Sequence, residues 1–324
     1  MNAIFQKTCP VCGDGVEPVG RRVYCSPACK QVSYRNKKEG VVTIAPKRPI
    51  LRYHGGKWRL AHWIMPFLTA IEHQVYVEPF CGAASVLAQK PRIGHEVLND
   101  LNGRVVNLFR VLRDPAKAQR LAKLVYLTPY SNQEYWECRV PADDPVEDAR
   151  RMMTVAAQAF STSAVAGGKG QTKTTWRRRI SERNASPATS WAAMPDVVMA
   201  WAERLRGVSL EHDTAINVIK RWDNPDVLFF VDPPYLHSTR NRGGRGYAHE
   251  MSDAEHIEMA EVLHQVQGAV VLCGYPSELY DRLFKDWRRV ERRGYTGGVR
   301  TPTEVLWINR GEGRLEETPK NLTG

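Results

Sequence analysis

Residues 229–240 read FFVDPPYLHSTR, in which an apolar run leads directly into an aspartate, two prolines and a tyrosine. The run Val227–Val231 predicts a buried strand, because short stretches of β-branched and aromatic residues that end at turn formers are typical of strands. Proline has a fixed φ angle and no N–H to donate, so the strand must end where the prolines begin. Ligands of open parallel sheets bind beyond the carboxyl ends of strands. Asp232 and Tyr235 therefore stand where a binding site is expected.

Strands and helices alternate on both sides of this stretch. Further strands are expected at Gln74–Glu78, His95–Asn99, Val208–Leu210, Ala269–Cys273 and Glu304–Asn309. Apolar residues at helical spacing predict helices between them. These include Ala83–Gln89, Leu101–Leu112 and a helix that starts at the capping box Ser252–Glu255 and buries Ile257, Ala260, Leu263 and Val266. This alternation predicts an α/β fold with a doubly wound, mostly parallel, Rossmann-like sheet.

Residues 113–207 break the alternation. A helical stretch at 148–160 is followed by a segment rich in Gly, Ser, Thr and basic residues, and Trp191 and Trp201 come after it. The apolar helix and the tryptophans favour an ordered, inserted lobe over a disordered loop. Lysine and arginine exceed aspartate and glutamate by 11, which favours a polyanionic partner, although a merely basic soluble protein has the same composition. No apolar stretch is long enough to cross a membrane and no signal peptide is recognisable, so a cytoplasmic protein is expected.

Four of the seven cysteines crowd the N-terminus, namely Cys9, Cys12, Cys25 and Cys29. Two pairs of closely spaced thiolates can supply a complete tetrahedral zinc site without a large core beneath them. In a cytosolic chain such a cluster favours a metal over disulfides. The spacing predicts a structural zinc site, with free thiols as the alternative. A site closed by four cysteines leaves no open position for catalysis.

Two other strand ends carry residues suited to a nucleoside. Gly82 lets the backbone approach a ligand closely, and Asp100 follows at about the distance of the acid that holds ribose hydroxyls in dinucleotide folds. No G-x-G-x-x-G sequence is present, so a pyrophosphate cradle is not indicated. This favours a nucleoside without phosphates, such as S-adenosylmethionine, over NAD.

The Asp-Pro-Pro-Tyr motif suits an amino group as the second substrate. The prolines hold the Asp232 carboxylate and the Pro233 carbonyl as a rigid pair of acceptors, which matches the two hydrogens of the exocyclic amine of adenine or cytosine. Tyr235 is able to cover the face of a base that has left its stack.

In the order of these motifs the chain resembles the amino-specific DNA methyltransferases of the DNA adenine methylase type, the D12 class. The similarity extends from about residue 50 to 309, apart from the lobe, and rests on RYHGGKWRL, VEPFCGAASV, LNDLNGRVVNLFRVL, DPPY, SDAEHIEMAEVL, GAVVLCGYPS and TEVLWINR. It implies cofactor contacts from Tyr53, Lys57, Glu78, Pro79, Phe80, Gly82, Asp100, Asp213 and Asp232, and a catalytic motif formed by Asp232, Pro233, Pro234 and Tyr235. One departure is Ala84, which stands where the family usually has a second glycine.

The resemblance implies methyl transfer from S-adenosylmethionine to N6 of an adenine flipped out of double-stranded DNA, with no catalytic metal. It divides the chain into a zinc motif (1–38), a linker (39–52), a methyltransferase core (53–112 and 208–310), a target-recognition lobe (113–207) and a flexible tail (311–324). A bacterial or phage origin and a role in restriction–modification also follow from it. Expected DNA contacts are Lys169, Lys173, Arg177, Arg178, Arg179, Arg183, Arg240, Arg242 and Arg245.

Three alternatives stay open at this point. The same acceptor pair suits N4 of cytosine, and the same chemistry suits adenine in RNA. The third alternative is a zinc-bearing DNA-binding protein without catalytic activity, although such a protein has no physical need for an intact Asp232, Pro233, Tyr235 and Asp100.

Overall fold

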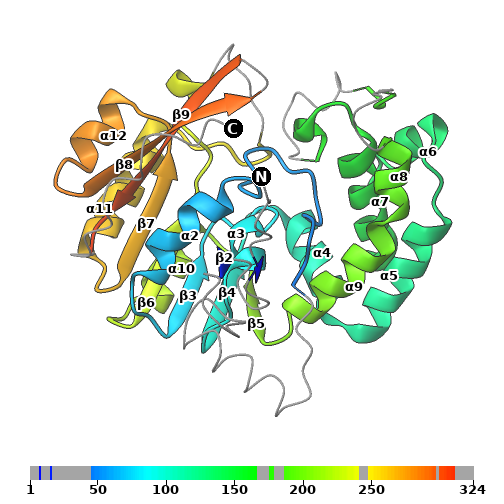
Figure 1. Ribbon diagram of the computed structural model, residues 1–324, viewed down its shortest axis with the longest axis horizontal. Helices are drawn as coiled ribbons and strands as arrows, with labels where there is room; N and C mark the ends of the chain where they lie inside the picture. The colour runs from blue at the N-terminus through cyan, green and yellow to red at the C-terminus, as the bar shows by residue number, and fades with distance from the viewer. Residues whose placement is uncertain are drawn as a thin grey trace, which may run out of the picture.

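The computed structural model describes residues 7–8, 15–16, 45–165, 175–178, 186–240, 247–296 and 299–310. In Figure 1 a twisted sheet with helices on both faces occupies the left and centre, and a group of helices stands to its right. No helix of the described residues is both long and apolar enough to cross a membrane.

The central sheet has seven strands in the order β5-β4-β3-β6-β7-β9-β8. Its strands are β3 (Val75–Glu78), β4 (His95–Asn99), β5 (Val208–Glu211), β6 (Val227–Val231), β7 (Ala269–Gly274), β8 (Arg288–Thr296) and β9 (Val299–Ile308). The first five in this order pair in parallel, whereas β9 runs antiparallel to both β7 and β8. The order of strands reverses between β3 and β6, which is the switch point where doubly wound sheets bind ligands. The predicted α/β fold with a mostly parallel sheet is confirmed.

Helices cover both faces of the sheet. One apolar cluster packs Phe230 of β6 against α2 (Ala61–Thr69), α3 (Ser85–Gln89) and α4 (Gly103–Arg113). The other packs Phe229 and Val231 against α10 (Ala215–Trp222), α11 (Asp253–Gln265) and α12 (Glu278–Leu283). All five residues of β6 are buried, because a strand covered on both faces has no solvent side. The short 3-10 helix η3 (His237–Thr239) follows the Asp-Pro-Pro-Tyr motif.

The inserted lobe is helical where it is described. It contains α5 (Pro115–Leu127), α6 (Asn132–Glu137), α7 (Pro145–Gln158), η1 (Thr162–Ala164), α8 (Pro187–Ala192) and α9 (Met194–Arg204). Arg204 of α9 forms a fully buried ion pair with Glu96 of β4, with 2.7 Å between Arg204 Nη1 and Glu96 Oε2, and it also donates to Leu87 O of α3. The lobe is therefore attached to the sheet by charge as well as by apolar packing.

Two expectations about the elements were wrong in detail. The last strand begins at Val299, not Glu304, and pairs with an unexpected strand, β8. The capping box of α11 is present, but the buried face includes His256 and Met259, while Ile257 is 37% exposed. This face of the helix points inward because the His256 side chain forms a buried hydrogen bond, with 2.9 Å between its Nδ1 and the Tyr280 hydroxyl.

Two short strands lie near the N-terminus. β1 (Lys7–Thr8) and β2 (Gly15–Val16) pair antiparallel. The four clustered cysteines lie outside the described residues, as do residues 311–324.

Candidate active site

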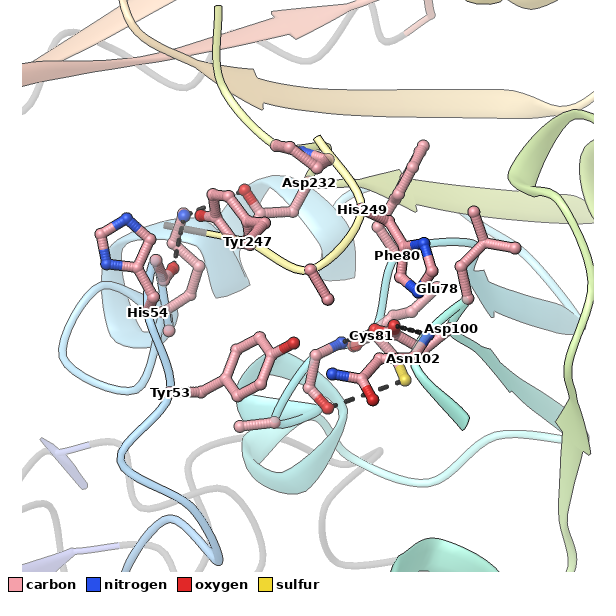
Figure 2. A pocket seen from close by; sticks show the side chains of 18 of the residues that line it. Tyr53, His54, Glu78, Phe80, Cys81, Asp100, Asn102, Asp232, Tyr247 and His249 are labelled. Carbon is pink, nitrogen blue, oxygen red and sulfur yellow. Dashed lines mark hydrogen bonds and ion pairs between the residues drawn. The ribbon is translucent and has the colours of Figure 1, made fainter. Parts of the chain in front are cut away.

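A cavity lies at the carboxyl ends of β3, β4 and β6. Figure 2 shows that its wall combines the glycine loop after β3, the acid after β4, Asp232 after β6 and the segment around Tyr53. We call it the first cavity. Among the residues proposed for cofactor contact, those on its wall are Tyr53, Lys57, Glu78, Phe80, Gly82, Asp100 and Asp232. Pro79 is buried next to them.

Asp100 holds the glycine loop against the end of β4. Its Oδ2 accepts a hydrogen bond from the Gly82 amide at 2.8 Å, and its Oδ1 accepts one from Asn102 N at 2.8 Å. Burial raises the pKa of Asp100, and the two backbone N–H groups oppose that rise. Gly82 has φ +48°, and a Cβ there would lie 3.2 Å from the Tyr53 ring. The loop thus needs glycine at this position, both for its backbone angle and for the aromatic wall beside it.

Ala84 adopts a left-handed backbone, with φ 46° and ψ 39°. It is the one non-glycine residue with positive φ in the described chain. An L-residue is strained in this conformation by about 1–2 kcal/mol, so the position would suit glycine. Ala84 offers α3 no side-chain cap.

Glu78, the last residue of β3, caps the first turn of α3 in place of Ala84. Its Oε1 accepts hydrogen bonds from Leu87 N at 2.7 Å and from the Tyr76 hydroxyl at 2.9 Å. Burial raises the pKa of Glu78 to about 8, although both hydrogen bonds favour the ionised form. A cationic ligand in the first cavity would favour ionisation further.

Asn99, which sequence reasoning noted only as a strand end, ties three strand ends together. Its Nδ2 donates to Pro79 O at 2.8 Å and to Asp213 O at 3.0 Å, and its Oδ1 accepts from Asp213 N at 2.9 Å. The side chain of Asp213 points elsewhere. It accepts hydrogen bonds from Asn217 at 3.0 Å, from Arg221 at 2.6 Å and from Thr214 N, and these bonds lower its pKa to about 2. Asp213 is not among the residues that line the first cavity.

Lys57 and Asp232 form the charged centre of the site. Lys57 Nζ lies 2.9 Å from Asp232 Oδ1 and donates to Gly55 O at 2.8 Å. Burial alone would lower the pKa of Lys57, but the charges of Asp232 and Glu304 outweigh it and raise that pKa well above its usual value. Burial raises the pKa of Asp232 to about 6, with Lys57 opposing the rise. Asp232 Oδ1 contacts Lys57 as an ion pair but accepts no hydrogen bond within the described protein.

A second cavity adjoins the first. The two share Tyr53, His54, Gly55, Gly56, Lys57 and Tyr247 as a common wall. The second is lined further by Leu60, Tyr235, Thr239, Arg240, Tyr275 and Glu304. Asp232 lies on the wall of the first and Tyr235 on the wall of the second, so the Asp-Pro-Pro-Tyr motif connects both cavities. Pro234 also lines the first cavity, and both prolines of the motif are buried.

Sequence reasoning missed several residues of this wall. The Tyr235 hydroxyl donates to Glu304 Oε2 at 2.8 Å, and Cys273 Sγ lies 3.2 Å from the same hydroxyl. Tyr247 closes over Gly55, whose φ is +71° and where a Cβ would lie 2.2 Å from the Tyr247 hydroxyl oxygen. The glycine pair in RYHGGKWRL was the available signal, since two glycines indicate close approach of another group.

Three of the expected DNA contacts lie in described regions. Arg177 and Arg178 follow Trp176 in the lobe. The backbone N–H of Arg177 donates to Gln158 O at 2.7 Å, and its carbonyl accepts from the Tyr130 hydroxyl at 2.6 Å. Arg240 lines the second cavity, is 9% exposed and pairs with Glu250 at 2.8 Å. The remaining six, Lys169, Lys173, Arg179, Arg183, Arg242 and Arg245, lie outside the described residues.

The residues of the first cavity fit S-adenosylmethionine. The glycine loop and the Tyr53 ring leave a cradle that a Cβ at Gly82 would fill. The acidic residues Asp100 and Glu78 lie on the same wall, which suits a cationic ligand. Within the described part of the chain no group of three or more His, Cys, Asp or Glu side chains could hold a metal ion.

Comparison with known proteins agrees with this geometry. A search of curated proteins returned no match. Residues 53–294, about three quarters of the chain, match the family described as D12 class N6 adenine-specific DNA methyltransferase. The match spans the glycine loop, the acid after β4, the helical lobe and the Asp-Pro-Pro-Tyr motif. The chain therefore belongs to the D12 class of N6 adenine-specific DNA methyltransferases, enzymes that methylate adenine in DNA with S-adenosylmethionine as methyl donor.

Proposed function

We propose that this enzyme takes its target adenine out of double-stranded DNA and holds it in the second cavity, while S-adenosylmethionine occupies the first. The observation that carries the proposal is the common wall of the two cavities, with Asp232 on one side and Tyr235 on the other. A base stacked inside a duplex cannot reach such a buried carboxylate, so it must be extruded.

The residues of the motif then act on the N6 amine. The two N–H groups of the amine donate hydrogen bonds to Asp232 and to the Pro233 carbonyl, which keeps the nitrogen lone pair free and directed at the first cavity. S-adenosylmethionine, when bound, supplies an electrophilic methyl group on a positively charged sulfur. The negative charge of Asp232 stabilises the positive charge that develops on N6 as the N–C bond forms and the methyl–sulfur bond of the donor breaks, and N6 then releases one proton to solvent. Tyr235 supplies an aromatic wall for the base, and the buried site keeps water away from the amine.

Lys57 keeps Asp232 in the ionised form that this role needs. A buried carboxyl group without a partner would take up a proton at neutral pH. The ion pair at 2.9 Å opposes that tendency, and the Gly55 carbonyl fixes the ammonium group in place.

One assay separates this proposal from its rivals. The protein is incubated with labelled S-adenosylmethionine and with unmethylated duplex DNA, single-stranded DNA or RNA, and the labelled base is identified after digestion. We expect N6-methyladenine in duplex DNA, and a loss of at least a hundredfold with Asp232→Ala. Label at cytosine N4, or label in RNA alone, would refute the assignment. Enhanced fluorescence of 2-aminopurine at the target position would report extrusion of the base.

We also propose residues 113–207 as the lobe that contacts DNA. The run of three arginines at 177–179 lies in this segment, and the whole chain has a net charge of +11, which favours DNA because cations set against phosphates release counterions. Replacing Arg177 and Arg178 together by alanine should weaken binding at low salt and reduce the slope of log affinity against log salt by up to about 2. An unchanged slope would exclude these two side chains from the interface.

A structural zinc bound by Cys9, Cys12, Cys25 and Cys29 is proposed on the donor set and on the β1–β2 pairing. Lys7 pairs with Val16 and Thr8 with Gly15, and the first Cys pair stands between these two strands in the sequence. Native protein should contain about one zinc per chain by elemental analysis, as expected for a site closed by four thiolates. Protein purified without chelator and free of zinc would refute it.

A further inference from the structure

The reversed direction of β9 brings one more carboxylate to the active site. The parallel strands contribute residues from their carboxyl ends, but β9 runs antiparallel to β7, with Val305 opposite Gly274. The residues of β9 next to Val305 therefore lie at the functional edge of the sheet, beside the carboxyl end of β7. Glu304, directly before Val305, lines the second cavity together with Tyr235.

Glu304 makes the closest polar contact of the Tyr235 side chain. The phenol O–H donates to Glu304 Oε2 at 2.8 Å, and the Cys273 thiol lies 3.2 Å from the phenol oxygen. The edge of Tyr275 packs on the Tyr235 ring at 4.5 Å between centroids, and Lys57 Nζ lies 4.7 Å from the ring centroid. Carboxylates form stronger hydrogen bonds than neutral acceptors, so Glu304 is the main anchor of the phenol oxygen.

Glu304 also acts on the Lys57–Asp232 pair by charge. It raises the pKa of Lys57, second only to Asp232 among the attracting charges, and it contributes to the raised pKa of Asp232. The titratable groups around it come from every neighbouring element: Lys57 and His54 before α2, Asp232 and Tyr235 after β6, Arg240 and Tyr247 in the segment that follows, Cys273 and Tyr275 at the end of β7, and Arg292 opposite it on β8.

We propose that Glu304 is a positioning residue for adenine methylation, which holds Tyr235 at the wall of the second cavity and adds a second negative charge beside Lys57. This inference rests on the proposed role of the second cavity as the base pocket. Two effects follow that can be separated. Removing the carboxylate frees the Tyr235 ring, whereas replacing it by an amide keeps an acceptor for the phenol and removes only the charge.

The experiment measures kcat, KM and their pH dependence for the full chain with duplex DNA and S-adenosylmethionine. Glu304→Ala is expected to lower kcat by about ten- to a hundredfold with little change in KM for S-adenosylmethionine, because the first cavity is untouched. Glu304→Gln should keep kcat within about fivefold and shift the acid limb of kcat/KM to lower pH. Glu291→Gln, an exposed glutamate on β8, is the matched control and should change neither quantity.

Thermal unfolding tests the contact without turnover. The midpoints of Glu304→Ala, Tyr235→Phe and the double variant form a cycle, in which the double variant should lose little more than the larger single loss. If the two single losses instead add up in the double variant, the Tyr235–Glu304 contact is refuted. This result does not depend on whether the protein shows activity. An alanine variant with wild-type kcat and an unmoved acid limb would overturn the role in catalysis. Absence of methylation by the wild-type protein would count against the proposed function alone, and the unfolding cycle would still decide the contact.

Discussion

Replacing Lys57 by methionine should move the acid limb of the pH profile upward. Methionine fills a similar space in this buried position but leaves Asp232 without its cation. The pKa of Asp232 is about 6 with Lys57 at 2.9 Å. A neighbouring cation lowers the pKa of an aspartate by about 1 to 3, so the variant should have a pKa of about 7 to 9. That corresponds to about 1.4 to 4 kcal/mol of lost preference for the ionised carboxylate.

The loss of activity follows from the ionised fraction. At pH 7.5 a carboxyl group with a pKa of about 6 is roughly 97% ionised, whereas one with a pKa of about 8 is roughly 24% ionised. The pH-dependent part of kcat/KM should therefore fall about fourfold at pH 7.5 and recover near pH 9.5. Activity is present above the pKa of Asp232 and lost as the pH falls through it, so raising this pKa moves the loss into the neutral range.

The assay is the pH dependence of kcat/KM between pH 5 and 10 for wild-type protein and Lys57→Met. Lys57→Arg keeps the positive charge and should leave the acid limb near the wild-type position. Asp232→Asn should show no acid limb from this group. A Lys57→Met profile that is lower at every pH but still falls near pH 6 would refute the reasoning, because Lys57 would then affect the rate without acting on the Asp232 charge.

Three further predictions concern stability. Ala84→Gly should change the free energy of unfolding by no more than about 1 kcal/mol, since relief of the left-handed strain is offset by the greater freedom of glycine in the unfolded chain. Ala84→Val should lower the free energy of unfolding in urea by more than about 2 kcal/mol, because β-branched residues rarely have positive φ. Glu96→Gln leaves Arg204 buried without a counter-charge and should cost about 3–5 kcal/mol, while Glu96→Leu combined with Arg204→Met should cost less; equal losses would contradict this. Burial lowers the pKa of His256 to about 4, so stability is lost as the pH falls from about 6.5 towards 4. Between pH 7.5 and 5 the free energy of unfolding of the wild type should therefore fall by about 2 kcal/mol more than that of His256→Gln, which chemical denaturation measures.

The sequence was a good guide to buried strands and a poor one to the edge of the sheet. β3, β4, β6 and β7 are short apolar runs between turn formers, and all four lie within one residue of the expected positions. β8 reads RRVERRGYT, whose charges hide the strand pattern. Edge strands commonly carry such charges, which discourage pairing with other chains. The orientation of α11 was missed because its buried His256 depends on Tyr280, which lies 24 residues further along the chain.

Some residues of the active site were likewise predictable from the sequence, and others were not. Residues at the ends of parallel strands, such as Gly82, Asp100 and Asp232, were expected, and the structure places them on one cavity wall. Asp213 stands at a comparable strand end, but its carboxylate forms an ion pair with Arg221 of α10 and does not line the first cavity. Glu304 was not considered as a site residue because it precedes the part of β9 that pairs with β7, and only the antiparallel direction of β9 places that part at this edge of the sheet.

The reversed last strand also affects when the site is completed during synthesis. Lys57 and Glu304 are separated by most of the chain, and the second cavity needs both. A nascent chain that ends before β9 already contains the glycine loop, Asp100 and the Asp-Pro-Pro-Tyr motif, but Tyr235 lacks its hydrogen bond to Glu304. The parallel core is then able to form first, and its catalytic wall closes only when β9 inserts between β7 and β8. We therefore expect a chain stopped before residue 299 to retain the cofactor cavity and to lack methyltransferase activity until the last strand is added.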